Sequence, residues 1–218
     1  MHDQLLGTTQ PVLSVALEPG EGVIGMAGEF AWMTDSIQMT TAADGLSAYA
    51  AQEYAGTIAF ASRRPGRIVA LDVAAGQHYL VHQDGFLAGT PGIKLTADDD
   101  CVLRRIGGTG RVWIELSGEV FRRELTAGTS LRTHPWHIGI CDATVAVQMA
   151  AVTEPARDRA GADVRLLAVL SGPGSVWLQS TPHYVPAVEG AAGPHVASLP
   201  HAPSDYDRGS HEHEDLRT

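Results

Sequence analysis

A threefold internal repeat is the feature that most constrains how this chain of 218 residues can fold. Gly20, Gly76 and Gly128 align without a gap, and they stand 56 and 52 residues apart. Apolar residues recur at four offsets from these glycines: Leu17, Val73 and Leu125; Phe30, Phe86 and Ile138; Ile37, Ile93 and Val145; and Met39, Leu95 and Val147. A period of this length predicts one supersecondary unit that is present three times.

Each copy is composed of short β-rich runs separated by glycine turns. Residues 12–17 form such a run and lead into the turn at Gly20, and residues 37–40 alternate between apolar and polar side chains. Alternation with a period of two predicts strands with one buried face. Three further pairs of runs are interpreted as β-hairpins, whose glycine-rich turns share one position at Gly66, Gly110 and Gly174.

Residues 41–55 are the only helix-like segment of the chain. Alanine is frequent there, and Leu46, Tyr49 and Ala50 stand at helical spacing, which predicts a helical or loop insertion. Because so little helix is available for crossover connections, the sheets are expected to be antiparallel. The predicted fold class is therefore all-β with little helix.

The chain divides into three parts of different composition. Residues 1–11 are a polar lead-in, and residues 12–180 form the β domain, with repeats over about 12–60, 61–105 and 106–180. Residues 181–218 hold five of the twelve prolines and five of the ten histidines, and they are acidic. This composition predicts a tail that is mostly disordered.

Composition and charge narrow the cellular setting. The net charge of −10 repels phosphate backbones, so nucleic acid is not the expected partner. No apolar run approaches the roughly 20 residues that a membrane-spanning helix needs. The N-terminus lacks the basic and apolar regions of a signal peptide, and Cys101 and Cys141 do not make a disulfide framework. These features predict a cytoplasmic protein.

Several segments carry a family resemblance that covers roughly residues 12–180. The opening segment is LEPGEGVIGMAGEFAWMTDSIQMTT, and the closing segment is LLAVLSGPGSVWLQS. The positions that carry the likeness are Leu17, Gly20, Glu21, Ala27, Gly28, Phe30, Met33, Met39, the run from Ala55 to Phe60, and the run from Leu166 to Ser180. In these positions the chain resembles the AIM24 family, also known as DUF124.

The resemblance implies a triplicated double-stranded β-helix, similar to a β-sandwich and related to the TRAP-like superfamily. The family has no established enzymatic activity or cofactor, so the resemblance implies neither for this chain. A mitochondrial member of the family is associated with inner-membrane organisation. Two departures stand out. Residues 41–55 replace a basic amphipathic insertion but contain no Lys or Arg, and Thr57 replaces the usual Glu.

Histidines are the natural candidates for a metal site in such a fold. A cupin-like site needs two His two residues apart on one strand and a third ligand. Neither His78 with His82 nor His134 with His137 has that spacing, so we expect no catalytic residue, metal site or cofactor in the β domain. The acidic tail contains one His-x-His pair, His211 and His213, as a weak metal-binding candidate.

Arginines flank two of the glycine turns and form the second candidate site. Arg63, Arg64 and Arg67 surround the first turn, whereas the second is surrounded by Arg104, Arg105 and Arg111. If these turns lie at one end of the molecule, the arginines make an anion-binding or RNA-binding surface. Trp136, next to Pro135, departs from the repeat and is a candidate interface residue.

The function that these features favour is a non-catalytic binding or scaffold protein. It would act through protein–protein contacts and associate with itself, because open β-sheet edges and faces promote homo-oligomers. Two alternatives stay open: a cupin-like metal-dependent enzyme, and a protein that binds RNA or anions through its arginine-bearing turns.

Overall fold

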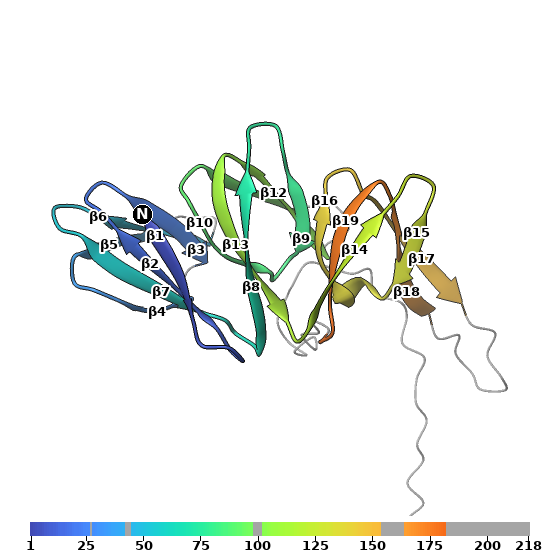
Figure 1. Ribbon diagram of the computed structural model, residues 1–218, viewed down its shortest axis with the longest axis horizontal. Helices are drawn as coiled ribbons and strands as arrows, with labels where there is room; N and C mark the ends of the chain where they lie inside the picture. The colour runs from blue at the N-terminus through green and yellow to red at the C-terminus, as the bar shows by residue number, and fades with distance from the viewer. Residues whose placement is uncertain (27, 42–44, 98–101, 154–163, 182–218) are drawn as a thin grey trace, which may run out of the picture. The chain divides into compact units, whose positions relative to one another are not determined.

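The computed structural model describes residues 1–26, 28–41, 45–97, 102–153 and 164–181, and all of these lie in one compact unit, Met1–Tyr184. The described residues form four antiparallel sheets (Figure 1). Their one helical segment is a 3-10 turn, η1 (Pro135–His137). No helix among them is long and apolar enough to cross a membrane. The prediction of an all-β fold with little helix is confirmed.

Sheets A and B contain the first eight strands of the chain together with β10 and β13. Sheet A comprises, in spatial order, β1 (His2–Leu6), β2 (Val12–Leu17), β7 (Gly56–Ala61) and β4 (Phe30–Met33). Sheet B comprises β5 (Ile37–Thr41), β6 (Leu46–Ala51), β3 (Gly22–Met26), β10 (Phe86–Gly89), β13 (Gly110–Ser117) and β8 (Gly66–Val73). The first strand, β1, falls within the residues expected to be a lead-in.

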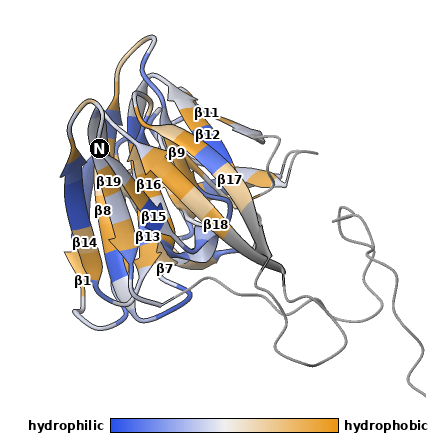
Figure 2. Cartoon of the chain, turned by 90° about the vertical axis from the view of Figure 1, so that its right-hand side faces the viewer, coloured by the Kyte–Doolittle hydropathy of each residue, from blue (hydrophilic) through white to orange (hydrophobic). Residues whose placement is uncertain are grey.

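Sheets C and D contain β9, β11, β12 and the strands from β14 onward. Sheet C comprises β11 (Ile93–Ala97), β12 (Leu103–Gly108), β9 (Tyr79–His82), β16 (Ile138–Asp142), β19 (Gly174–Gln179) and β14 (Val120–Leu125). Sheet D comprises β15 (Ser130–Thr133), β18 (Val164–Ser171) and β17 (Ala146–Thr153). Figure 2 shows apolar stretches along strands such as β16 and β18, which supply much of the interior.

Three hydrophobic clusters join successive sheets. The first combines Leu13 and Phe60 of sheet A with Tyr49 and Trp113 of sheet B. The second combines residues of sheets B and C, such as Ile114 and Val81, and the third combines residues of sheets C and D, such as Cys141 and Leu170. Sheets B and C therefore bury apolar side chains on both faces, whereas sheet A contributes to one cluster only.

The three glycines that align in the sequence have the same conformation. Gly20, Gly76 and Gly128 have φ of +85°, +80° and +80°, in the left-handed region that glycine adopts without strain. In each turn the next residue donates its backbone N–H to the carbonyl three residues before it, at 2.9, 2.9 and 3.0 Å. Each turn carries the chain from a strand of one sheet into the next sheet.

The aromatic or apolar residue ten positions after each of these glycines lies at a β-bulge. The irregularities fall between Phe30 and Trp32 where β4 pairs with β7, between Phe86 and Ala88 where β10 pairs with β13, and between Ile138 and Ile140 where β16 pairs with β19. A bulge turns the next side chain to the other face of the sheet. Sequence spacing alone gave no sign of these bulges.

The three predicted hairpins are wrong. The strands on either side of Gly66 belong to sheets A and B, those around Gly110 to sheets C and B, and those around Gly174 to sheets D and C. These glycine-rich turns are corners that lead from one sheet into another. Local turn residues favour a change of direction, but they do not specify which distant strand the chain pairs with afterwards.

The helix predicted within residues 41–55 is also wrong. β6 occupies Leu46–Ala51 and lies between β5 and β3, with Tyr49 paired to both Met39 and Val23. Ser47, Tyr49 and Ala51 are buried, whereas Ala48 is exposed, which is the period of a strand. Pairing within sheet B therefore overrides the helical preference of the alanines.

Candidate functional site

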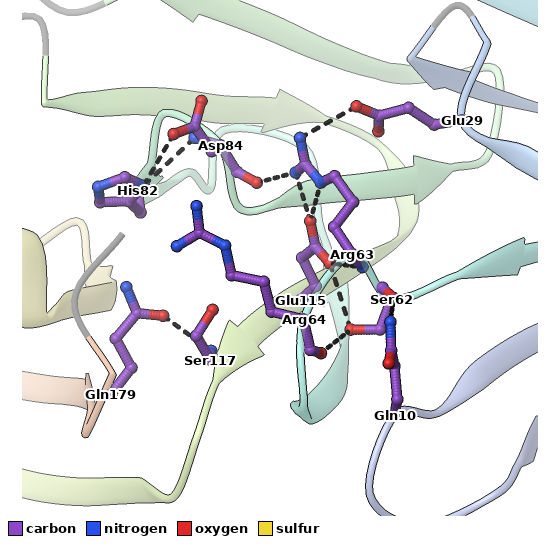
Figure 3. A network of polar contacts seen from close by, with 10 residues as sticks. All are labelled: Gln10, Glu29, Ser62, Arg63, Arg64, His82, Asp84, Glu115, Ser117 and Gln179. Atoms are coloured by element: carbon purple, nitrogen blue, oxygen red, sulfur yellow. Dashed lines mark hydrogen bonds and ion pairs between the residues drawn. The ribbon is translucent and has the colours of Figure 1, made fainter. Parts of the chain in front are cut away.

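A network of charged side chains lies where the chain passes from sheet A to sheet B. Arg63 follows β7, and Glu115 projects from β13 with a residue exposure of only 2%. The backbone N–H of Arg63 donates to Glu115 Oε2 at 2.9 Å, and its guanidinium donates to Glu115 Oε1 (Figure 3). The Ser62 hydroxyl donates to Glu115 Oε2 at 3.2 Å. The buried carboxylate is thus neutralised and hydrogen bonded, as a charge in the interior requires.

The same guanidinium reaches two further loops. Its Nη1 donates to Glu29 Oε1 at 3.0 Å, and its Nη2 donates to the backbone carbonyl of Asp84. Arg63 therefore joins the β3–β4 and β9–β10 loops to the strand that carries Glu115. The arginine that we singled out as an anion-binding residue acts here as a link between elements of sheets A, B and C.

Glu29 is held in an unfavourable environment for a carboxylate. Burial raises the pKa of Glu29 above its ordinary value, and the neighbouring Glu115 and Asp84 add to this rise, while Arg63 opposes it. Its Oε2 is buried and accepts no hydrogen bond from a described residue. Burial outweighs the attraction of one guanidinium that Glu29 shares with Glu115.

A neutral counterpart of this network lies where the chain passes from sheet B to sheet C. The backbone N–H of Ser117 donates to Gln179 Oε1 at 3.0 Å, as that of Arg63 does to Glu115. Gln179 Nε2 then donates to the Trp136 carbonyl at 3.1 Å, and His137 Nδ1 lies 2.8 Å from the Gln179 carbonyl. Gln179 is five residues beyond Gly174, and Glu115 is five beyond Gly110. Both side chains therefore fasten a sheet-to-sheet connection.

The histidines that were considered as metal ligands lie apart from one another and make separate contacts. His78 lies 2.6 Å from Arg105 Nη1, and buried His82 accepts a hydrogen bond from the Asp84 backbone at 3.3 Å on its Nδ1. The rings of His134 and His137 stand 6.3 Å apart. Among the described residues, no group of three His, Cys, Asp or Glu side chains could hold a metal ion. His211 and His213 lie outside the described residues.

The candidate arginines also lie in different places. Arg67 and Arg111 are at opposite ends of the β8–β13 pair, because Arg111 faces Asp72 and Leu116 faces Arg67. Five residues along a strand correspond to about 17 Å. Arg111 is bound by Asp72 at 2.9 Å and Asp3 at 3.0 Å, and Arg67 lies 3.7 Å from Glu119.

The other members of the arginine set are on two further elements. Arg104 and Arg105 are on β12, opposite Val81 and Leu80. Arg64 is partly buried, and its carbonyl accepts a hydrogen bond from Ser62. An anion-binding or RNA-binding surface made of all six arginines stays a prediction, and the observed ion pairs do not favour it.

Trp136 lies on the short η1 turn and is partly buried. Its ring centroid is 5.5 Å from that of His82, and its carbonyl accepts the hydrogen bond from Gln179. These contacts explain its departure from the repeat, since it packs on the end of β9. Its role as an interface residue stays a prediction.

Exposed apolar side chains were not identified from the sequence, and they concentrate near the N-terminus. Seven large apolar residues are exposed among the described part of the chain, and all but Phe121 precede residue 55: Met1, Leu5, Leu6, Trp32, Met39 and Tyr54. A hollow of about 560 Å³ lies nearby, lined by Leu5, the loop after β1, Pro65–Ile68 and Gly118–Glu119. Three of the seven, Leu5, Leu6 and Trp32, lie on strands of sheet A.

The fold has a counterpart among solved structures. The X-ray crystal structure of protein SPYM3_0169 from Streptococcus pyogenes matches the chain with a TM-score of 0.66 and 16% sequence identity. The match covers 83% of this chain and 94% of the other. At this identity the likeness shows a shared fold and carries no information on activity.

The sequence itself shows the family. No curated protein matches the chain. The model of the family described as "Mitochondrial biogenesis AIM24" matches residues 4–181, which include every described strand except the first two residues of β1. The resemblance inferred from the repeat segments is thereby confirmed, and the chain belongs to the AIM24 family.

Proposed function

We propose that this chain is a non-catalytic binding or scaffold protein of the cytoplasm, which acts through protein–protein contacts and self-association. The observation that carries the proposal is the gathering of exposed apolar side chains on the N-terminal strands, including Leu6, Trp32 and Met39. Large apolar side chains left exposed on a sheet face are typical of interaction sites.

Open strand edges add to this surface. The end strands of the sheets present unpaired backbone groups along one side, and β4 and β5 are end strands of sheets A and B. Such edges pair readily with another chain.

We further propose that the β domain is triplicated, as in the TRAP-like double-stranded β-helix. Three observations support this: the shared conformation of Gly20, Gly76 and Gly128, the bulge that follows each of them, and a recurring clamp. In the clamp, the side chains of Thr34, Thr90 and Asp142 accept a hydrogen bond from the backbone N–H of Thr57, Arg111 and Ser175.

The described cysteine favours a structural role. Burial raises the pKa of the Cys141 thiol to about 12, and Asp142 adds to the rise, so the thiol stays protonated at neutral pH. A protonated, buried thiol is a poor nucleophile. A free buried cysteine also suits a reducing compartment.

Sedimentation velocity of the full chain tests the proposal. We expect the average mass to rise from that of a monomer as the concentration increases through the micromolar range. The same sample, used as bait in a lysate of its own organism, should retain defined protein partners. A chain that stays strictly monomeric and turns over a substrate in a metal-dependent manner would contradict the proposal.

A further inference from the structure

Sheet A, like sheet D, contributes to one hydrophobic cluster only, so no described sheet covers its other face. Leu13, Val15 and Phe60 of this sheet enter the first hydrophobic cluster, so the alternate residues of the same strands point to the opposite side. These residues form the outer face of sheet A: His2, Gln4, Leu6, Val12, Ser14, Ala16, Trp32, Thr57, Ala59 and Ala61. None of the ten is Asp, Glu, Lys or Arg.

The cross-strand pair that follows each bulge contains one tryptophan. The pairs are Trp32 with Ala59 in sheet A, Ala88 with Trp113 in sheet B, and Ile140 with Trp177 in sheet C. Trp32 stands on the bulged strand of its pair, whereas Trp113 and Trp177 stand on the partner strand.

The three indoles differ in how far neighbouring residues cover them. Trp113 is fully buried in the cluster between sheets A and B, and its Nε1 donates to Asp3 Oδ2 of β1 at 3.1 Å. Trp177 packs against the cluster between sheets B and C, with the Arg122 guanidinium 5.0 Å from its ring. Trp32 is 50% exposed. In sheets B and C the preceding sheet covers this face, but no described sheet precedes sheet A.

A molecule that binds the outer face of sheet A must match an uncharged surface. The chain carries a net charge of −10, so two copies repel each other unless they meet through a region without charge. The outer face of sheet A is such a region, whereas a basic partner would be recognised by carboxylates that this face lacks. The charge pattern therefore favours a second copy of this chain.

The outer face is also complementary to itself in shape. Trp32 projects from the edge strand β4, whereas the middle strand β2 carries the small side chains of Ser14 and Ala16. A twofold axis that lies between two such faces and runs along the strands sets β4 of one copy over β1 and β2 of the other. Each indole then packs on the partner's small residues, as in an isologous interface between aligned sheets.

We propose that the outer face of sheet A binds the same face of a second copy, with Trp32 as the central contact. This inference rests on the proposed self-association and assigns it a surface. Four strands of about five residues give a face of roughly 19 by 17 Å. Such a face is smaller than the roughly 800 Å² per partner of a standard interface, so the dimer should dissociate on dilution.

Two exposed aromatic residues provide a matched test by sedimentation velocity. Trp32→Ser removes the central contact, and Phe121→Ser removes an equally exposed ring (48%) from the edge of sheet C. We expect Trp32→Ser to weaken dimerisation at least about tenfold and Phe121→Ser to leave it unchanged. Ala16→Arg, which leaves Trp32 in place and adds a charge to an exposed position, should also yield monomers. Circular dichroism and thermal melting confirm that each variant is folded.

A cysteine on the twofold-related face tests the symmetry. In a Cys101→Ser background, Ser14→Cys should give a dimer with a short bismaleimide, whereas Phe121→Cys should not. Dimers that survive in both Trp32→Ser and Ala16→Arg, or that Phe121→Ser disrupts equally, would overturn the assigned surface but leave self-association intact. A wild-type chain that is monomeric at every concentration would overturn both, and its co-sedimentation with phospholipid vesicles would assign the face to a membrane.

Discussion

Sheets A and B each place a tryptophan in the equivalent cross-strand pair, yet Trp32 is half exposed and Trp113 is fully buried. Trp32 stands on the edge strand β4 and faces away from sheet B, whereas Trp113 stands on the interior strand β13 and faces sheet A. Sheet A covers Trp113, and β1 supplies Asp3 to bond its N–H. An end sheet of a stack therefore presents to solvent a surface that the inner sheets bury, which makes it the natural place for a partner.

The largest expected loss of stability comes from a substitution in the packing between sheets A and B. Trp113→Ala should lower the free energy of unfolding by about 3–5 kcal/mol, because it removes a fully buried aromatic side chain and leaves a cavity. Trp32→Ala, in the equivalent cross-strand pair of sheet A, should cost less than about 1 kcal/mol. Urea denaturation at low protein concentration measures both. Equal losses would show that exposure does not distinguish the two positions.

The charged connection between the sheets should be more sensitive than the neutral one. Glu115→Ala leaves Arg63 without its buried partner and should cost about 2–3 kcal/mol, a value reduced because the guanidinium is partly hydrated. Gln179→Ala leaves the Ser117 N–H without its acceptor and should cost about 1–2 kcal/mol.

Salt provides the control for this pair of variants. The loss from Glu115→Ala should shrink in concentrated sodium chloride, whereas that from Gln179→Ala should not change. A reversed order of the two losses at low salt would contradict the roles assigned to these connections.

Asp3 contacts both Trp113 and Arg111, and substitutions of Asp3 separate the contributions of these two contacts to stability. Asp3→Ala removes the acceptor from the Trp113 indole and the charge next to Arg111, so we expect a loss of about 1–2 kcal/mol. Asp3→Asn keeps an acceptor for the indole and should retain more than half of this stability. Thermal melting of the two variants measures the difference, and indistinguishable melting curves would assign the whole effect to the charge.

Substitution of Glu29 should have the smallest effect on stability, and this effect should change with pH in a defined direction. Its pKa is raised in the folded chain, so the folded state binds this proton more tightly than the unfolded state does. The contribution of Glu29 is therefore present below its unfolded pKa and is lost as the pH rises through its folded pKa. The Glu29→Gln variant should gain stability relative to the wild type as the pH rises above about 4.5. A relative loss over that range would mean that the ion pair with Arg63 dominates.

Local sequence patterns predicted the family and the strand-rich fold, but they did not predict how the strands combine. The turn at Gly20 and the alternation at Ile37 depend on neighbouring residues, and both are visible in the sequence. The corner at Gly66 depends on β8 pairing with β13, more than 40 residues away. The same limit hid the contact between Arg63 and Glu115, 52 residues apart.

The remaining errors of prediction arise at residues whose type fits more than one structure. β6 consists largely of small residues, and alanine suits either a helix or a strand face, so helical spacing at Leu46 and Tyr49 misled the interpretation. The exposure of Trp32 could not be predicted either. Trp32 and Trp113 belong to equivalent cross-strand pairs, but one is exposed and the other buried, because the residues that cover an indole lie on a different sheet.

The most direct test of the end-sheet account is a nitrogen–proton NMR titration of the indole N–H groups against protein concentration. Tryptophans 32, 113, 136 and 177 give separate signals that substitution assigns. The account predicts that the Trp32 signal shifts as dimers form, while those of Trp113 and Trp177 stay in place. A rising mass with an unmoved Trp32 signal would contradict it.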